Sequence, residues 1–152
     1  MDTDWNRILL HQWQWHWEHQ LRPRLGGLTD DEYFWSPAPD AWSVRPRGRS
    51  TAPIQAGAGD FTIDYAFPPP DPAPFTTIAW RLGHVIVGVL AMRNAAHFGA
   101  PAASYDTWQY AGDAATALAQ LARSSTPGYA GYATSARRPC SPPSATRSRT
   151  RS

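Results

Sequence analysis

The chain has 152 residues, of which 42% are hydrophobic, and this suffices for one domain with its own core. Its net charge of +2 averages two unlike parts. Residues 1–123 carry nine Arg and twelve acids, which gives −3, whereas residues 124–152 carry five Arg and no acid, which gives +5. Because the part that can fold is acidic, the pI near 9.0 does not indicate a nucleic-acid-binding surface, and we expect no nucleic-acid function.

The composition changes abruptly at Ser124. All the Leu, Ile, Val, Phe, Trp and Met residues lie before it, and the remainder consists mainly of Ser, Thr, Pro, Ala and Arg. A segment without large apolar side chains cannot offset the entropy lost when its backbone is ordered. We therefore predict a folded domain over residues 1–123 and a disordered tail over residues 124–152.

The sequence gives no sign of a membrane or of a disulfide. Cys140 is the only cysteine, so no internal disulfide can form. The polar N-terminus has no apolar signal core, and the longest apolar stretch, residues 78–92, is too short to cross a bilayer. We expect a cytoplasmic protein without membrane contact.

Residues 3–22 have the pattern of an amphipathic helix, which Pro23 and the following Gly26-Gly27 would end. Apolar and aromatic side chains recur at helical spacing, and we expect this stripe to face the core. The stripe consists of Trp5, Leu9, Trp13 and His16, widened by Trp17 and Leu21.

A long connection follows over residues 26–52. It begins with a capping-box pattern, Thr29 followed three residues later by Glu32, which predicts a short helical turn. Arg45, Arg47 and Arg49 then form a basic cluster, which is either a solvated loop or a grip for a phosphate or carboxylate. Beyond it, residues 61–67 have the pattern of a short extended segment.

The strongest helix is predicted to begin after a cap at Thr76 or Thr77 and to end at Gly99. It is apolar on nearly every side, so we expect it to be central. Residues 105–123 have the pattern of a third helix. Three helices with long connections favour an all-α bundle, but an incomplete one, because the central helix requires neighbours on every side.

His84 is the most informative polar residue, because it lies in the second turn of this apolar helix. Small residues such as Gly88 follow on its face, so there is room for a ligand or for a close helix contact. His84 is therefore either a metal ligand or a core histidine with a hydrogen-bond partner. His16 and His19 have the spacing of a metal pair, and Trp35, Trp42 and Trp80 have the character of cavity walls. The chain contains no Glu-x-x-His pair, no nucleotide-binding glycine loop and no Gly-x-Ser-x-Gly elbow.

Two blocks of the sequence carry a family resemblance. Residues 21–48 read LRPRLGGLTDDEYFWSPAPDAWSVRPRG, and residues 61–99 include the run TTIAWRLGHVIVGVLAMRNAAHFG. Both are similar to the actinobacterial branch of the DinB family of metal-binding four-helix proteins. The resemblance implies an up-down helical bundle around a divalent metal of the zinc or nickel type. It also implies a thiol-dependent transferase, with mycothiol as cofactor and a small molecule or thiol as substrate.

The resemblance places the first metal ligand of the family on His84, and it places Trp80, Gly88 and His16 in the pocket. The two later ligands do not carry over, because the sequence has no histidine after His97. We therefore expect a bundle that lacks its last helix and a metal that this chain does not retain. A reading-frame shift near codon 124 would explain both, and the downstream nucleotide sequence tests it. A transferase or hydrolase-like activity is then expected only with the missing helix restored, and the alternative is a non-catalytic bundle that forms a homodimer or is vestigial.

Overall fold

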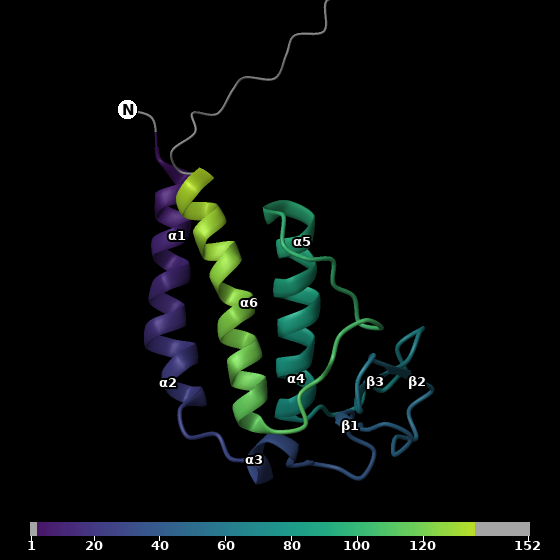
Figure 1. Cartoon of the computed structure of the whole chain (residues 1–152). Helices are drawn as coiled ribbons and strands as arrows, with labels where there is room; N and C mark the ends of the chain where they lie inside the picture. Colours follow the sequence, from purple (N-terminus) through teal and green to yellow (C-terminus); the bar gives the residue numbers. More distant parts are fainter. Residues whose placement is uncertain (1–2, 136–152) are drawn as a thin grey trace, which may run out of the picture.

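The computed structural model describes residues 3–135, with the side chains of residues 3–125. Within these residues, three long helical segments lie side by side, with a small sheet against one end (Figure 1). The first contains α1 (Trp5–His16), the π-helical turn η1 (Trp17–Leu21) and α2 (Arg22–Leu25). The second contains α4 (Ile78–His84), the π-helical turn η2 (Val85–Ala91) and α5 (Met92–Phe98), and the third is α6 (Ala114–Ser135). Residues 136–152, with Cys140, lie outside the described residues.

The helix ends predicted at Thr29, Thr77 and Gly99 are present, and Asp4 adds a cap that was not predicted. The side chain of Asp4 accepts a hydrogen bond from Arg7 N at the start of α1. Thr29 and Glu32 form the capping box of the short helix α3 (Asp30–Phe34), and Thr77 caps α4 by accepting from Trp80 N. Gly99 ends α5 in the left-handed conformation, with φ of 68°. These local signals act within one turn of chain, so the sequence reveals them.

A three-stranded antiparallel sheet corrects the all-α prediction. The strands are β1 (Val44–Pro46), β2 (Ile54–Ala56) and β3 (Phe61–Tyr65), in the order β1-β3-β2. The extended segment predicted over residues 61–67 is the central strand β3. The edge strands are missed because each has only three residues, too few to show an alternating pattern.

The third helix begins later and continues further than predicted. It begins at Ala114, because Asp113 accepts from Thr116 N and Asp30 of α3 accepts from Ala114 N, which together satisfy the helix N-terminus. It continues past the helix end predicted at Arg123 and ends at Ser135. Asn94 of α5 donates to the carbonyl of Ser124 at 2.6 Å, so a tertiary contact fixes the chain just where its composition changes.

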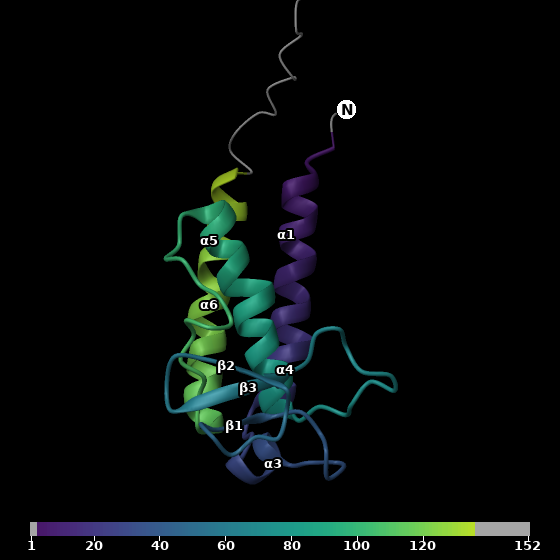
Figure 2. The same ribbon diagram turned by 90° about the vertical axis from the view of Figure 1, so that its right-hand side faces the viewer.

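The direction of α6 differs from an up-down arrangement. Figure 1 shows α6 running in the same direction as α4 and α5 and opposite to α1. The connection over residues 99–113 returns along the helices before α6 begins (Figures 1 and 2). Along its length α6 contacts α1, α4, η2 and α5.

The core lies where α4 and η2 meet the sheet, α3 and α6. Tyr33 of α3 is 1% exposed and donates to the carbonyl of Ala111. The α4–α5 segment is not enclosed on every side as predicted, because Val89 and Met92 are exposed. The buried side chains of the core are Tyr33, Val44, Ala56, Ile63, Ala79, Leu82, Ile86, Val87, Leu90, Tyr110, Ala111, Ala114, Ala117 and Leu121.

The apolar stripe predicted to face the core lies at the surface instead. Trp5 is 66% exposed, Leu9 53% and Trp13 43%, and α1 contains no buried residue. Helical periodicity locates an apolar face but does not establish that anything covers it. Among the described helices, α6 is the main neighbour of α1, and it covers one side only. No helix within residues 3–135 is both long and apolar enough to cross a membrane.

One buried carboxylate joins the sheet to the start of α4. Asp64 of β3 is 2% exposed, and its Oδ2 accepts from Ser43 N at 3.0 Å and from Arg45 Nε at 3.1 Å. The backbone carbonyl of Asp64 accepts from Trp80 Nε1 at 2.7 Å. Ser43 and Thr77, the cap of α4, share a hydrogen bond of 2.9 Å. Among the described residues, Asp64 Oδ1 and Thr62 Oγ1 have no hydrogen-bond partner.

This geometry predicts that Arg45→Met destabilises the fold. The buried carboxyl of Asp64 would lose its only ion-pair partner within the described residues, and Arg45 is 33% exposed, so we expect a loss of about 2 kcal/mol. Urea unfolding measures it. The exposed Arg49 supplies the control, since Arg49→Met should change stability by less than about 0.5 kcal/mol. Adding Asp64→Asn should recover part of the loss, and equal effects of the two Arg substitutions would contradict this role of Asp64.

Candidate functional site

A cavity of about 260 Å³ lies between β3, α4 and the connection that precedes α6. Its walls are largely apolar and aromatic, and its polar atoms are few, which is typical of a small-molecule site. The lining residues are Ile63, Asp64, Tyr65, Trp80, His84 and Tyr105.

His84 is the only imidazole of this cavity. Its ring stacks on that of Trp80, with centroids 5.2 Å apart and planes 11° apart. Its Nδ1 lies 2.6 Å from the hydroxyl oxygen of Tyr105. The Trp80 ring is itself fixed by its hydrogen bond to the backbone carbonyl of Asp64. The position of His84 therefore depends on the sheet as well as on its own helix.

Tyr105 reaches His84 because Gly88 leaves space for it. A Cβ atom at position 88 would collide with the Tyr105 hydroxyl oxygen and would lie 3.1 Å from Cζ of the same ring. Gly88 follows His84 by one helical turn, so the absent side chain is what allows the phenol to lie against the helix. A second contact holds the segment, since the Tyr110 hydroxyl donates to the carbonyl of Tyr105.

The hydroxyl of Tyr105 stays protonated at neutral pH. Burial raises the pKa of Tyr105 above its ordinary value, and the neighbouring Tyr65 raises it further. A protonated phenol can donate to Nδ1 of a neutral His84, which then carries its proton on Nε2. The cavity thus contains one hydrogen-bonded imidazole–phenol pair among apolar walls.

The structure brings three of the four predicted site residues together. His84 and Trp80 line the cavity, and Gly88 shapes it through Tyr105. His84 is not the core histidine that was one of the two predicted alternatives, because its side chain is exposed at the rim of the cavity. His16 is not part of the cavity: it is exposed on α1, where its ring meets the edge of Trp15. Within the described residues α1 contacts mainly α6, so its histidines do not reach α4.

The sequence missed the other walls of the cavity. Tyr65 and Tyr105 come from segments that are far from His84 in sequence, and their rings lie 6.3 Å apart. The one sequence signal for these walls was Gly88, whose small size predicted room for a ligand or a close contact, and Tyr105 occupies that room. Trp42 does not line the cavity but packs against Trp80, with ring centroids 6.1 Å apart and ring planes tilted by 36°.

The described residues do not fit a tightly bound divalent metal. No group of three or more His, Cys, Asp or Glu side chains comes together within the part of the chain that the structure describes. At His84, the neighbouring polar group is a phenol that remains protonated, which is a poor metal ligand. A single imidazole does not make a stable zinc or nickel site, so the described residues do not support a metal-dependent reaction step.

The arginine cluster has a structural role. Arg45 pairs with Asp64, and Arg47 donates to the carbonyls of Gly57 and Gly59, so it clamps the turn between β2 and β3. Of the two alternatives for this cluster, Arg45 does hold a carboxylate, but one that belongs to the chain itself, and Arg47 holds backbone carbonyls.

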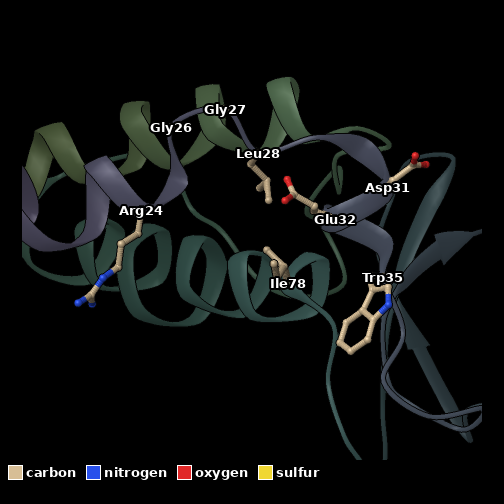
Figure 3. Close-up of a pocket in the computed structure, with 8 residues that line it drawn as sticks. All are labelled: Arg24, Gly26, Gly27, Leu28, Asp31, Glu32, Trp35 and Ile78. Carbon is tan, nitrogen blue, oxygen red and sulfur yellow. The ribbon is translucent and has the colours of Figure 1, made fainter.

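A larger cleft of about 450 Å³ lies beside α2 and α3 (Figure 3). Its charged groups do not converge: Figure 3 shows Arg24 and Asp31 pointing away from one another, and Glu32 is engaged in the cap at Thr29. Trp35 forms one wall and is 65% exposed. Convergent polar groups make the smaller cavity at His84 the better candidate site. The lining residues of the larger cleft are Arg24, Gly26, Gly27, Leu28, Asp31, Glu32, Trp35 and Ile78.

Comparisons with protein-family models, with curated proteins and with solved structures found no match for this chain.

The contact at Gly88 predicts the effect of a single methyl group. In Gly88→Ala the new Cβ would force the Tyr105 hydroxyl away from the helix and break its hydrogen bond to His84 Nδ1. The ¹⁵N chemical shift of His84 Nδ1 reports this bond. Tyr105→Phe removes the same bond directly, so both variants should move the Nδ1 signal in the same direction. An unchanged signal in Gly88→Ala would show that Gly88 does not position Tyr105.

Proposed function

We propose that this chain is a DinB-like helical protein that binds a small, largely apolar molecule in the cavity at His84. The observation that carries the proposal is the imidazole–phenol pair of His84 and Tyr105 at the edge of an aromatic cavity. Aromatic walls hold a flat apolar ligand by burial, and one polar pair can select for a ligand with a hydroxyl or amine. Of the two blocks on which the family resemblance depends, the second, residues 61–99, contributes Trp80 and His84 to this cavity.

The size of the cavity limits the ligand. Its volume of about 260 Å³ lies just below the range of about 300–1,000 Å³ that is usual for drug-sized ligands. A molecule with one or two rings therefore fits better than a large cofactor. Of mycothiol, the thiol that the family resemblance names, only the thiol end would enter the cavity, where Nε2–H of His84 could donate a hydrogen bond to the sulfur.

Binding is the function that these residues support without further groups. His84 and Tyr105 can orient a ligand and exchange a proton with it, and the other polar side chains among the described lining residues are Asp64, which is paired with Arg45, and Tyr65. We therefore propose binding as the activity of this chain. Thiol transfer, which the family resemblance implies, is expected only with the missing helix restored.

Phenol and toluene test the proposal, since they share a ring and differ in the hydroxyl group. Calorimetric titration should give dissociation constants on the order of 0.1–1 mM for such small ligands. His84→Leu should lower the preference for phenol over toluene by about tenfold, because it removes the hydrogen-bond partner.

His16→Leu is the matched control, since it makes the same substitution at an exposed histidine of α1, outside the cavity. It should leave both affinities unchanged. No binding of either ligand, or equal effects of the two His→Leu variants, would overturn the proposal.

We further propose that the chain retains no divalent metal. After dialysis against a metal-free buffer, elemental analysis should find less than about 0.1 equivalent of zinc or nickel, because one imidazole cannot hold either ion tightly. His84→Ala should not change that content. One equivalent of metal that is lost in His84→Ala would contradict this expectation and would assign the further ligands to residues outside 3–135.

A further inference from the structure

The exposed stripe on α1 is arranged to pair with itself. Its residues follow one another at intervals of four along α1 and η1, in the order Trp5, Leu9, Trp13, Trp17 and Leu21. Trp17 is half-buried against α6, and the exposed fractions of the other four run from 39% to 66%. Figures 1 and 2 show α1 at an outer edge of the described molecule, so a partner has free access to this face.

The apolar area of the stripe is comparable to the largest patch on a typical monomer but smaller than one side of a standard protein interface. If a fully exposed aromatic side chain offers about 200 Å², the stripe offers on the order of 400 Å² of apolar surface per copy. The largest apolar patch on a typical monomer measures about 300–600 Å², and such patches are often functional. A standard interface buries about 800 Å² per partner, so the flanking side chains of α1 and α6 would supply the rest.

The order of the side chains selects an antiparallel partner. When two copies of α1 run in opposite directions with Trp13 facing Trp13, Leu9 of each copy faces Trp17 of the other, and Trp5 faces Leu21. Apart from the central Trp13 pair, each Trp then faces a smaller Leu across the contact, which permits close packing. A parallel pairing would instead place every Trp against an identical Trp. The antiparallel direction also brings the Asp4 end of one helix to the basic end of the other, which carries Arg22 and Arg24.

The antiparallel pairing would bring Trp5, the most exposed residue of the stripe, to an apolar groove on the other copy. An apolar groove of about 230 Å³ lies between α6 and the η1–α2 segment that continues α1, and its walls include Trp17, Leu21, Leu118 and Leu121. In the antiparallel arrangement Trp5 of the second copy lies over Leu21, at the mouth of this groove. A tryptophan in an apolar pocket is the usual form of an interface hot spot.

We propose that two copies of this chain pair antiparallel through α1, with Trp5 of each copy inserted into the groove between α1 and α6 of the other. The contact is isologous, so it closes at two copies and does not propagate. It is independent of the cavity at His84, which involves no residue of α1.

Sedimentation of the full chain, with matched variants, tests the pairing. The dimer fraction should rise between about 1 and 100 µM. Trp13→Glu places two like charges on the two-fold axis and should raise the dissociation constant about thirtyfold or more. Trp15→Glu is the matched control, because Trp15 is 44% exposed and Trp13 43%, on different faces of one helix. It should change the constant less than threefold.

Trp5→Ala tests the groove itself. Trp5 is 66% exposed, so its truncation should leave the melting temperature of the diluted protein unchanged while it weakens the dimer at least tenfold. A chain that stays monomeric at 100 µM would overturn the proposal and would leave the stripe to another segment or another protein. Equal effects of Trp13→Glu and Trp15→Glu would overturn it as well.

A distance measurement tests the direction. A spin label at Thr3→Cys, in a Cys140→Ser background, lies near one end of α1. In the antiparallel dimer the two labels should be roughly 30 Å apart, because 20 residues at about 1.5 Å each separate the paired positions. In a parallel dimer the two labels would lie side by side, and that result would overturn the antiparallel arrangement.

Discussion

The buried carboxylate of Asp64 is the constraint on which the arrangement of the sheet and the site depends. A charge that is 2% exposed is costly unless it is paired, and here Ser43 N and Arg45 Nε both donate to Oδ2. Both donors come from the chain around β1, so the carboxylate fixes the register of β1 against β3. The backbone carbonyl of Asp64 also accepts a hydrogen bond from Trp80 Nε1, and this bond joins the sheet to the first turn of α4.

The cavity follows from that constraint. Because Trp80 is anchored to β3, the ring of His84 has a fixed surface on which to stack. The missing side chain of Gly88 then admits Tyr105, and buried Tyr110 holds the backbone of that segment through its hydroxyl. Three segments that are distant in sequence thus converge on one imidazole. The polar pair of the cavity is positioned by backbone contacts, and such contacts carry no local sequence pattern.

Local chemistry explains which parts of the fold the sequence predicts. The caps at Thr29 and Thr77 and the end at Gly99 depend on contacts within one turn, and all three are present as expected. The start of α6 depends on Asp30, a residue 84 positions away from the amide it caps, so periodicity placed that helix too early. The edge strands of the sheet are held by their pairing with β3 and by Arg45 and Arg47, which no short window reveals. His84, Trp80 and Gly88 could be chosen from spacing on one helix, whereas Tyr65 and Tyr105 could not.

Apolar periodicity has opposite consequences in the two long helical segments. In α4 and η2 the apolar residues are covered by the sheet and by α6, whereas in α1 a stripe of equal regularity faces outward. The difference is one of neighbours, not of side chains: α1 contacts mainly α6 among the described helices and adds no buried residue of its own. An exposed stripe of this kind costs solubility, and only an occupant recovers the free energy of burial. Because the stripe and the cavity share no element, pairing through α1 and binding at His84 can be altered one at a time, and each can therefore be tested without disturbing the other.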